Sequence, residues 1–213
     1  MTSTMQMNHP IEREIRASTF LDPRVYDELS ALLDKVYCED LSAPIRSLML
    51  TSPQPRSGVS YLASCISTML AERHGPTLLV DALAIVGLAR KGRIPTRFMC
   101  TQINHGHLWV LGSAPVAEMS ADSLVAPLSV REIIEKLELL FDYVMVDAPA
   151  MSISNAAEFL STAVNGSMLV VTPNVTEVRE VAQARSKLTK QGGRLVGAIY
   201  NRIDGNSGTG EML

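Results

Sequence analysis

The stretch "TSPQPRSGVS" (residues 51–60) lies between "IRSLML" (45–50), an apolar run typical of a buried strand, and "YLASCISTML" (61–70), which is typical of a helix. A strand, a loop rich in Gly, Ser and Pro, and a helix are the context of a phosphate-binding loop. In such a loop, backbone N–H groups and a helix N-terminus converge on an anion. The usual Gly-Lys-Ser/Thr ending is replaced by Gly58-Val59-Ser60. The sequence therefore predicts the shape of the loop without its cation.

Apolar runs on either side of this loop predict a sheet whose strands are buried on both faces, as in a parallel sheet. The runs are "TLLVDA" (77–82), "LWVLG" (108–112), "YVMVDAP" (143–149), "SMLVVTP" (167–173) and "LVGAIYN" (195–201). Helical patterns occur in "DPRVYDELSALLDKVYCED" (22–40), "SVREIIEKLELLF" (129–141) and "EVREVAQARSKLTKQGG" (177–193). Strands that alternate with helices predict an α/β fold with a doubly wound, mostly parallel sheet flanked by helices. We expect an N-terminal arm (1–21), one domain (22–204) and a C-terminal tail (205–213).

Composition narrows the function classes. The 213 residues are 46% hydrophobic, and the net charge of −3 gives no sign of the basic face that binds nucleic acid. Cys38, Cys65 and Cys100 are widely spaced, which favours neither disulfides nor a zinc site and suits a reducing cytoplasm. No signal pattern or membrane-length apolar run is evident, so we expect no direct membrane insertion and assign any membrane role to a partner.

The predicted phosphate donors are the backbone N–H groups of Ser57, Gly58, Val59, Ser60 and Tyr61. A charge-assisted hydrogen bond contributes about 1.5–3 kcal/mol, so loss of the lysine weakens nucleotide binding by roughly ten- to a hundredfold. One donor lost at the transition state costs about 2.7–4 kcal/mol, which affects phosphoryl transfer more severely. An ordinary turn before a helix is the alternative interpretation of the loop.

Asp81 and Asp147 each end an apolar strand run at the predicted carboxyl edge of the sheet, where α/β folds bind ligands. With the Ser60 hydroxyl they are the candidate magnesium ligands, and the two aspartates are the candidate catalytic groups. The alternative for each aspartate is that it caps the turn that follows. His105 and His107 lack further ligands in a metal-binding pattern and are interpreted as loop residues.

Four segments together resemble the cytoplasmic domain of bacterial tyrosine kinases (BY-kinases) of capsule and exopolysaccharide synthesis, within the division- and partition-type P-loop ATPases. "SLMLTSPQPRSGVSYLASCISTMLAE" (47–72) is similar to that family's first strand, phosphate loop and helix, and "GPTLLVDALAI" (75–85) to its second aspartate motif. "FDYVMVDAPA" (141–150) resembles the Walker B strand. "LVGAIYNRID" (195–204) resembles the strand whose Asn-Arg lies near the adenine, which implies nucleotide contacts for Asn201 and Arg202.

The departures from that family fall on its chemistry. Val59 replaces the loop lysine, Leu83 replaces a second acidic residue, and Asn155 stands where an aspartate is often found. The first helix has "YDELSALL" (26–33) in place of the Glu/Arg pattern associated with ring assembly. The tail "GNSGTGEML" (205–213) contains no tyrosine, whereas the family's autokinases carry a tyrosine cluster there.

Three functions are therefore open. The first is a pseudokinase, inactive or weakly active, that regulates exopolysaccharide (capsule) biosynthesis and export by binding a chain-length or export membrane protein or a related kinase. The second is an active ATP-dependent tyrosine kinase or ATPase in which Arg56 or a partner's basic residue replaces the lysine. The third is a positioning or partition ATPase. The resemblance implies ATP or ADP with magnesium, with no bound nucleotide as the alternative, and a cytoplasmic protein that a partner recruits to the inner face of the membrane. A homo-oligomer is left open.

Overall fold

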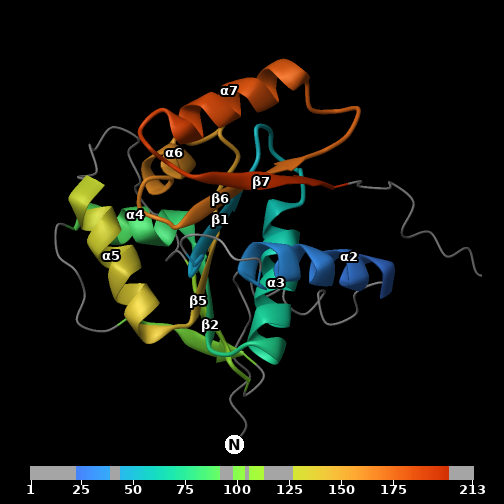
Figure 1. Cartoon of the computed structure of the whole chain (residues 1–213). Coiled ribbons are helices and arrows are strands. Elements are labelled where there is room, and N and C mark those ends of the chain that lie inside the picture. Colours follow the sequence, from blue (N-terminus) through green and yellow to red (C-terminus); the bar gives the residue numbers. More distant parts are fainter. Residues whose placement is uncertain (1–22, 39–43, 92–97, 104–105, 113–126, 202–213) are drawn as a thin grey trace, which may run out of the picture.

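The computed structural model describes residues 23–38, 44–91, 98–103, 106–112 and 127–201. The predicted arm (1–21) and the predicted tail (205–213) lie outside these ranges. The described residues form a single sheet with helices packed on both of its faces (Figure 1). The predicted fold class is confirmed.

The sheet has seven strands in the order β3-β4-β2-β5-β1-β6-β7. Their bounds are Ser47–Thr51 (β1), Thr77–Asp81 (β2), Thr101–Ile103 (β3), Leu108–Leu111 (β4), Tyr143–Asp147 (β5), Gly166–Val171 (β6) and Leu195–Tyr200 (β7). Every neighbouring pair is parallel except β3 with β4. The central strands β1 and β6 are buried along their whole length, as their continuous apolar runs predict.

Two hydrophobic cores separate the sheet from its helices. One lies under α2 (Pro23–Leu33), the π-helical turn Asp34–Cys38 and α3 (Val59–Arg73). The other lies under α4 (Ala82–Arg90), α5 (Pro127–Leu140), α6 (Ala156–Leu160) and α7 (Val178–Thr189). Adjacent residues of one strand enter opposite cores, as Met49 and Leu50 do in β1, because successive side chains of a strand point to opposite faces.

Three elements were not predicted. The antiparallel edge strand β3 has three residues and exposed or half-exposed side chains, so it lacks the apolar run that marks the other strands. Helix α4 follows β2 without a break, and Asp81 both ends the strand and caps the helix. Helix α6 has only five residues, which is too short to show a helical periodicity.

A partly buried cluster of hydrogen bonds fixes the start of β1, at the end of the sheet opposite the phosphate loop. The side-chain oxygen of Asn165 accepts hydrogen bonds from the backbone N–H groups of Arg46 (2.8 Å) and Ser47 (2.9 Å). The hydroxyl of the fully buried Ser47 in turn accepts from the N–H of Asn165 and donates to Glu138. These four hydrogen bonds join β1, α5 and the residue before β6.

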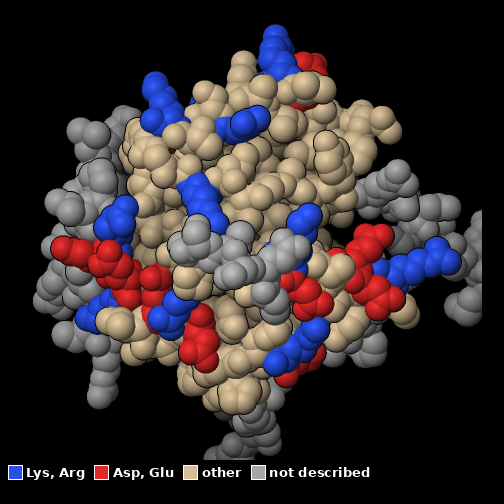
Figure 2. All heavy atoms as spheres, in the orientation of Figure 1, with Lys and Arg blue, Asp and Glu red and all other residues tan. Residues whose placement is uncertain are grey.

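Charged side chains are unevenly distributed over the surface. Acidic residues occur on α2 and α5, whereas α7 carries mainly basic residues. In Figure 2 the charged side chains of the upper part are mainly basic, and those of the lower part are of both signs. The basic residues of α7 are a local feature, because the net charge of the whole chain is −3.

Within the described ranges no helix has both the length and the apolar character needed to cross a membrane.

Candidate functional site

The predicted phosphate loop folds as a compact turn between β1 and α3. The hydroxyls of Ser52 and Ser57 both donate to the carbonyl of Gln54, over 2.6 and 2.9 Å, which holds the turn closed. Gly58 precedes the helix in the left-handed conformation (φ +81°), where a side chain is disfavoured. The carbonyl of Gly58 accepts a helical hydrogen bond from the N–H of Leu62.

The N–H groups of Val59, Ser60 and Tyr61 therefore occupy the first turn of α3, where a helix provides no acceptors. Together with the positive end of the helix dipole they form the anion-binding half of the predicted cradle.

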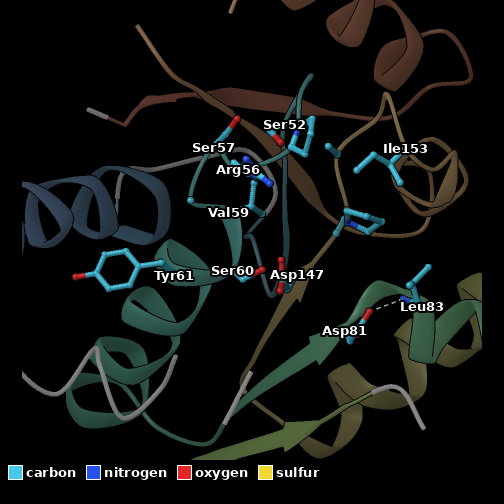
Figure 3. A pocket seen from close by; sticks show the side chains of 15 residues that line it. Ser52, Arg56, Ser57, Val59, Ser60, Tyr61, Asp81, Leu83, Asp147 and Ile153 are labelled. Carbon is cyan, nitrogen blue, oxygen red and sulfur yellow. Dashed lines mark hydrogen bonds between the residues drawn. The ribbon is translucent and has the colours of Figure 1, made fainter. Parts of the chain in front are cut away.

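A pocket of about 400 Å³ opens beside this turn, a size typical of small-molecule sites. Figure 3 shows it between the loop, the start of α3 and the ends of β2 and β5. It is lined by Ser52, Pro55, Arg56, Ser57, Gly58, Val59, Ser60, Tyr61, Asp81, Leu83, Asp147, Ala148, Pro149, Ala150 and Ile153. The five predicted phosphate donors (residues 57–61) and both predicted carboxylates are thus brought to one pocket.

The two carboxylates lie side by side in the sheet. Asp81 at the end of β2 is the direct register partner of Asp147 at the end of β5, and both are half-buried. Asp81 also caps α4, because its Oδ1 accepts a hydrogen bond from the N–H of Leu83 over 2.7 Å (dashed in Figure 3). The capping interpretation therefore holds for Asp81, and its predicted role with magnesium stays a prediction. Leu83, where the resemblance implies a second acid, gives the pocket an aliphatic wall.

Val59 and Ser60 are the first two residues of α3, and both line the pocket. Val59 is only 9% exposed and belongs to the hydrophobic core under α3, so no cation stands at this position. The Ser60 hydroxyl is directed toward the side of the pocket where Asp147 lies, whereas the Tyr61 ring points away (Figure 3). Burial and the neighbouring Cys65 raise the pKa of Tyr61. Tyr61 therefore lines the pocket near its backbone, where its N–H belongs to the phosphate cradle, while its ring is directed away.

Arg56 is the one basic side chain among the described residues that line the pocket. It is exposed and adopts a positive φ of 63°, which is uncommon for a residue with a side chain. It lies three positions before the missing lysine, on the rim and not at the helix start. The pocket therefore combines two carboxylates with one cation at its edge.

Asn201 supports the loop from the end of β7. Its backbone N–H donates to Val171, and its side-chain nitrogen donates to the carbonyl of Ser57, each over 2.9 Å. This side chain contacts the loop and is not one of the pocket-lining residues, so the predicted contact with an adenine stays a prediction. Arg202 and His105 lie outside the described residues, and His107 is exposed.

Sequence reasoning missed a link between the phosphate loop and α7. The side-chain nitrogen of Gln54 donates to one carboxylate oxygen of Glu180, while the other oxygen accepts from the N–H of Glu177 and completes a capping box. These bonds lower the pKa of Glu180, with the Gln54 hydrogen bond as the largest cause. Glu and Gln at this spacing from a helix start indicate a capping box, but a contact across 126 residues leaves no mark in the sequence.

The arrangement fits a nucleotide phosphate with magnesium in part. The cradle of N–H groups and the Ser60 hydroxyl are present, whereas the lysine is absent. Among the residues with described positions, no three His, Cys, Asp or Glu side chains are grouped closely enough to hold a metal. Mg²⁺ commonly binds one or two carboxylates together with substrate phosphates and water, so Asp81, Asp147 and Ser60 are suited to a nucleotide-bound ion and not to a free one. Such an ion neutralises charge on the phosphates.

The two curated proteins compared by sequence are both named as tyrosine-protein kinases. No family model matches the chain. It is 27% identical over 177 residues to tyrosine-protein kinase YwqD of Bacillus subtilis (strain 168), covering 74% of this chain and 72% of that protein. It is also 27% identical over 188 residues to the putative tyrosine-protein kinase CapB of Staphylococcus aureus, covering 76% and 78%.

Solved structures agree on the fold. The kinase domain of Escherichia coli tyrosine kinase ETK superposes with a TM-score of 0.66 at 19% identity, over 87% of this chain and 78% of that one. The septum site-determining protein MinD complexed with Mg-ADP from Pyrococcus horikoshii OT3 gives 0.55 at 18% identity, over 75% and 71%. At these identities the structures establish the shared fold alone.

Proposed function

Because this chain is a relative of the bacterial tyrosine-protein kinases, as its motifs predict, we propose that it is a pseudokinase that regulates exopolysaccharide biosynthesis and export by binding a partner protein. The partner is a membrane protein of chain-length control or export, or a related kinase. The pocket binds ADP or ATP weakly and transfers the phosphoryl group slowly or not at all.

The observation that carries this proposal is the buried Val59 at the first position of α3. A lysine there would aim its ammonium group at the β- and γ-phosphates, where charge accumulates during transfer. Its absence weakens ground-state binding by roughly ten- to a hundredfold and the transition state by about 2.7–4 kcal/mol. Leu83 adds to this loss, since it places a methyl-bearing side chain where a second carboxylate would orient water or magnesium.

The direct test restores the cation. Val59→Lys is compared with wild type and with Val59→Met, a control that lengthens the side chain without adding charge. Isothermal titration with ADP and ATP, with and without magnesium, is expected to show about ten- to a hundredfold tighter binding for Val59→Lys alone. Phosphorylation of a Glu/Tyr copolymer is followed by phosphotyrosine immunoblot, with Asp147→Ala as the background. Magnesium-dependent phosphorylation by wild type well above that background contradicts the pseudokinase.

Arg56 supports a second candidate, an active kinase or ATPase with a displaced cation. Its side chain lines the pocket and its backbone holds an uncommon positive φ. Under this alternative, wild type transfers phosphoryl groups and Arg56→Ala removes the activity. Arg56→Lys then separates the two possible roles, because a bidentate guanidinium contact is not replaced by an ammonium group, whereas a simple point charge is.

A further inference from the structure

The outward face of α7 carries several exposed basic side chains. Four exposed side chains define what we call the α7 basic face: Arg179, Arg185, Lys187 and Lys190. Lys190 caps the helix and the other three lie within it. In Figure 2 blue side chains dominate this upper part of the molecule, while red ones gather over α5 and α2.

Most of these charges are not neutralised locally. The two acidic residues of this segment are Glu177 and Glu180. Glu177 pairs with Arg179 at 3.4 Å, and both side chains are well exposed, so the pair contributes little. Glu180 is engaged by Gln54 on the loop side of the helix. Arg185, Lys187 and Lys190 have no salt bridge to any residue in the described ranges.

Exposed apolar side chains adjoin the cations at one end. Val178, the first residue of α7, is 85% exposed, and Val175 in the preceding turn is 63% exposed. Ala182 and Ser186, both exposed, lie between the cations along the outward face, so no bulky side chain blocks a flat partner. Apolar residues beside cations are the composition that amphipathic helices use at a membrane interface.

The geometry favours a broad anionic surface over a single bound anion. The 12 residues of α7 extend about 18 Å. Arg179 and Lys190 lie opposite the buried Leu188, in the middle of the outward face, whereas Arg185 and Lys187 lie on its two flanks. Long Lys and Arg side chains reach sideways and downward from such a convex surface to many headgroups at once. The chain carries a net charge of −3, so its overall charge opposes this attraction and the basic face alone would provide it.

We propose that the α7 basic face binds directly to the anionic headgroups of a lipid bilayer, with Val175 and Val178 at the headgroup boundary. From the absence of a signal pattern and of a membrane-length apolar run, the sequence predicts that any membrane role belongs to a partner. The packing of Ala184 and Leu188 against the sheet turns residues 185, 187 and 190 toward the surface of the folded protein. Each basic side chain near an anionic membrane increases partition about fivefold. Three unpaired cations therefore give weak, reversible and salt-sensitive binding.

The test is co-sedimentation of the full chain with large vesicles of phosphatidylcholine alone or mixed equally with phosphatidylglycerol. Wild type is expected to bind the mixed vesicles at low salt and to lose that binding at high salt. It is expected not to bind vesicles of phosphatidylcholine alone. Arg185→Gln/Lys190→Gln is expected to lower partition about 25-fold. Lys35→Gln/Lys91→Gln changes the net charge equally at exposed positions away from α7 and is expected to match wild type. The single variant Val178→Ser is expected to bind the mixed vesicles more weakly than wild type, with an unchanged salt dependence.

Several results overturn the proposal. These are failure of wild type to bind the mixed vesicles at low salt, and equal losses from both double variants. If soluble polyglutamate binds with the same dependence on Arg185 and Lys190 while vesicles do not, the face serves an acidic protein partner instead. Urea midpoints verify that every variant is folded. The assay contains no nucleotide, so its outcome is independent of whether the pocket binds one.

Discussion

The contact between Gly58 and Asn201 makes the phosphate loop depend on the end of β7. Gly58→Ala places a side chain in the left-handed conformation (φ +81°), which costs about 1–2 kcal/mol. The new Cβ also overlaps the side-chain nitrogen of Asn201. Asn201 must then turn away from the Ser57 carbonyl and lose a hydrogen bond of 2.9 Å, worth about 0.5–1.5 kcal/mol. We expect a total loss of roughly 1.5–3.5 kcal/mol in the free energy of unfolding.

A double-mutant cycle measured by urea unfolding isolates this contact. Asn201→Ala alone is expected to cost about 0.5–1.5 kcal/mol. In Gly58→Ala/Asn201→Ala the hydrogen bond is lost once and the overlap is absent, so the double variant should cost less than the sum by about 1 kcal/mol. Gly87→Ala is the matched control, because Gly87 lies inside α4 with no atom within 4 Å of an added Cβ. It is expected to stabilise the protein by roughly 0.5–1 kcal/mol.

Additive costs for the two substitutions, within about 0.5 kcal/mol, would refute this account of the loop. A changed slope of unfolding free energy against urea in any variant would show that the unfolded or native state had changed as a whole, and an unchanged slope is expected here.

Three further predictions concern hydrogen bonds elsewhere in the fold. Tyr37→Phe should raise the unfolding free energy by up to about 1 kcal/mol, because the buried hydroxyl has no hydrogen-bond partner among the described residues; a lower urea midpoint would contradict this. Ser47→Ala should lower it by about 1 kcal/mol, since the N–H of Asn165 loses its acceptor in a partly buried site, and a change below measurement error would argue against the cluster. The lowered pKa of Glu180 contributes stability at neutral pH that is lost as the pH falls through that lowered value. Gln54→Ala removes the largest cause, so NMR titration should find the Glu180 pKa raised toward its ordinary range; an unchanged pKa would show that Gln54 does not bind this carboxylate.

The sequence by itself determined the fold and predicted that residues 57–61, Asp81 and Asp147 meet, whereas Asn201, also predicted for the site, does not line the pocket. Continuous apolar runs such as residues 77–81 and 143–147 identify parallel strands, because both faces of such strands are buried. Parallel strands end at the same edge, so the loop, Asp81 and Asp147 had to meet there. The sequence also shows directly that Val59 stands where a phosphate loop usually has lysine. Local patterns carry this information because each feature depends on the order of residues along one element.

Only the tertiary structure decided how these residues are engaged. It assigned Asp81 to the cap of α4, Asn201 to the carbonyl of Ser57, and Gln54 to Glu180 across 126 residues. It also turned the dispersed cations of residues 179–190 into one outward surface by burying the opposite side of α7. Such pairings depend on distances between elements, and hydrogen bonds form only within about 3 Å, a precision that periodicity and composition do not contain.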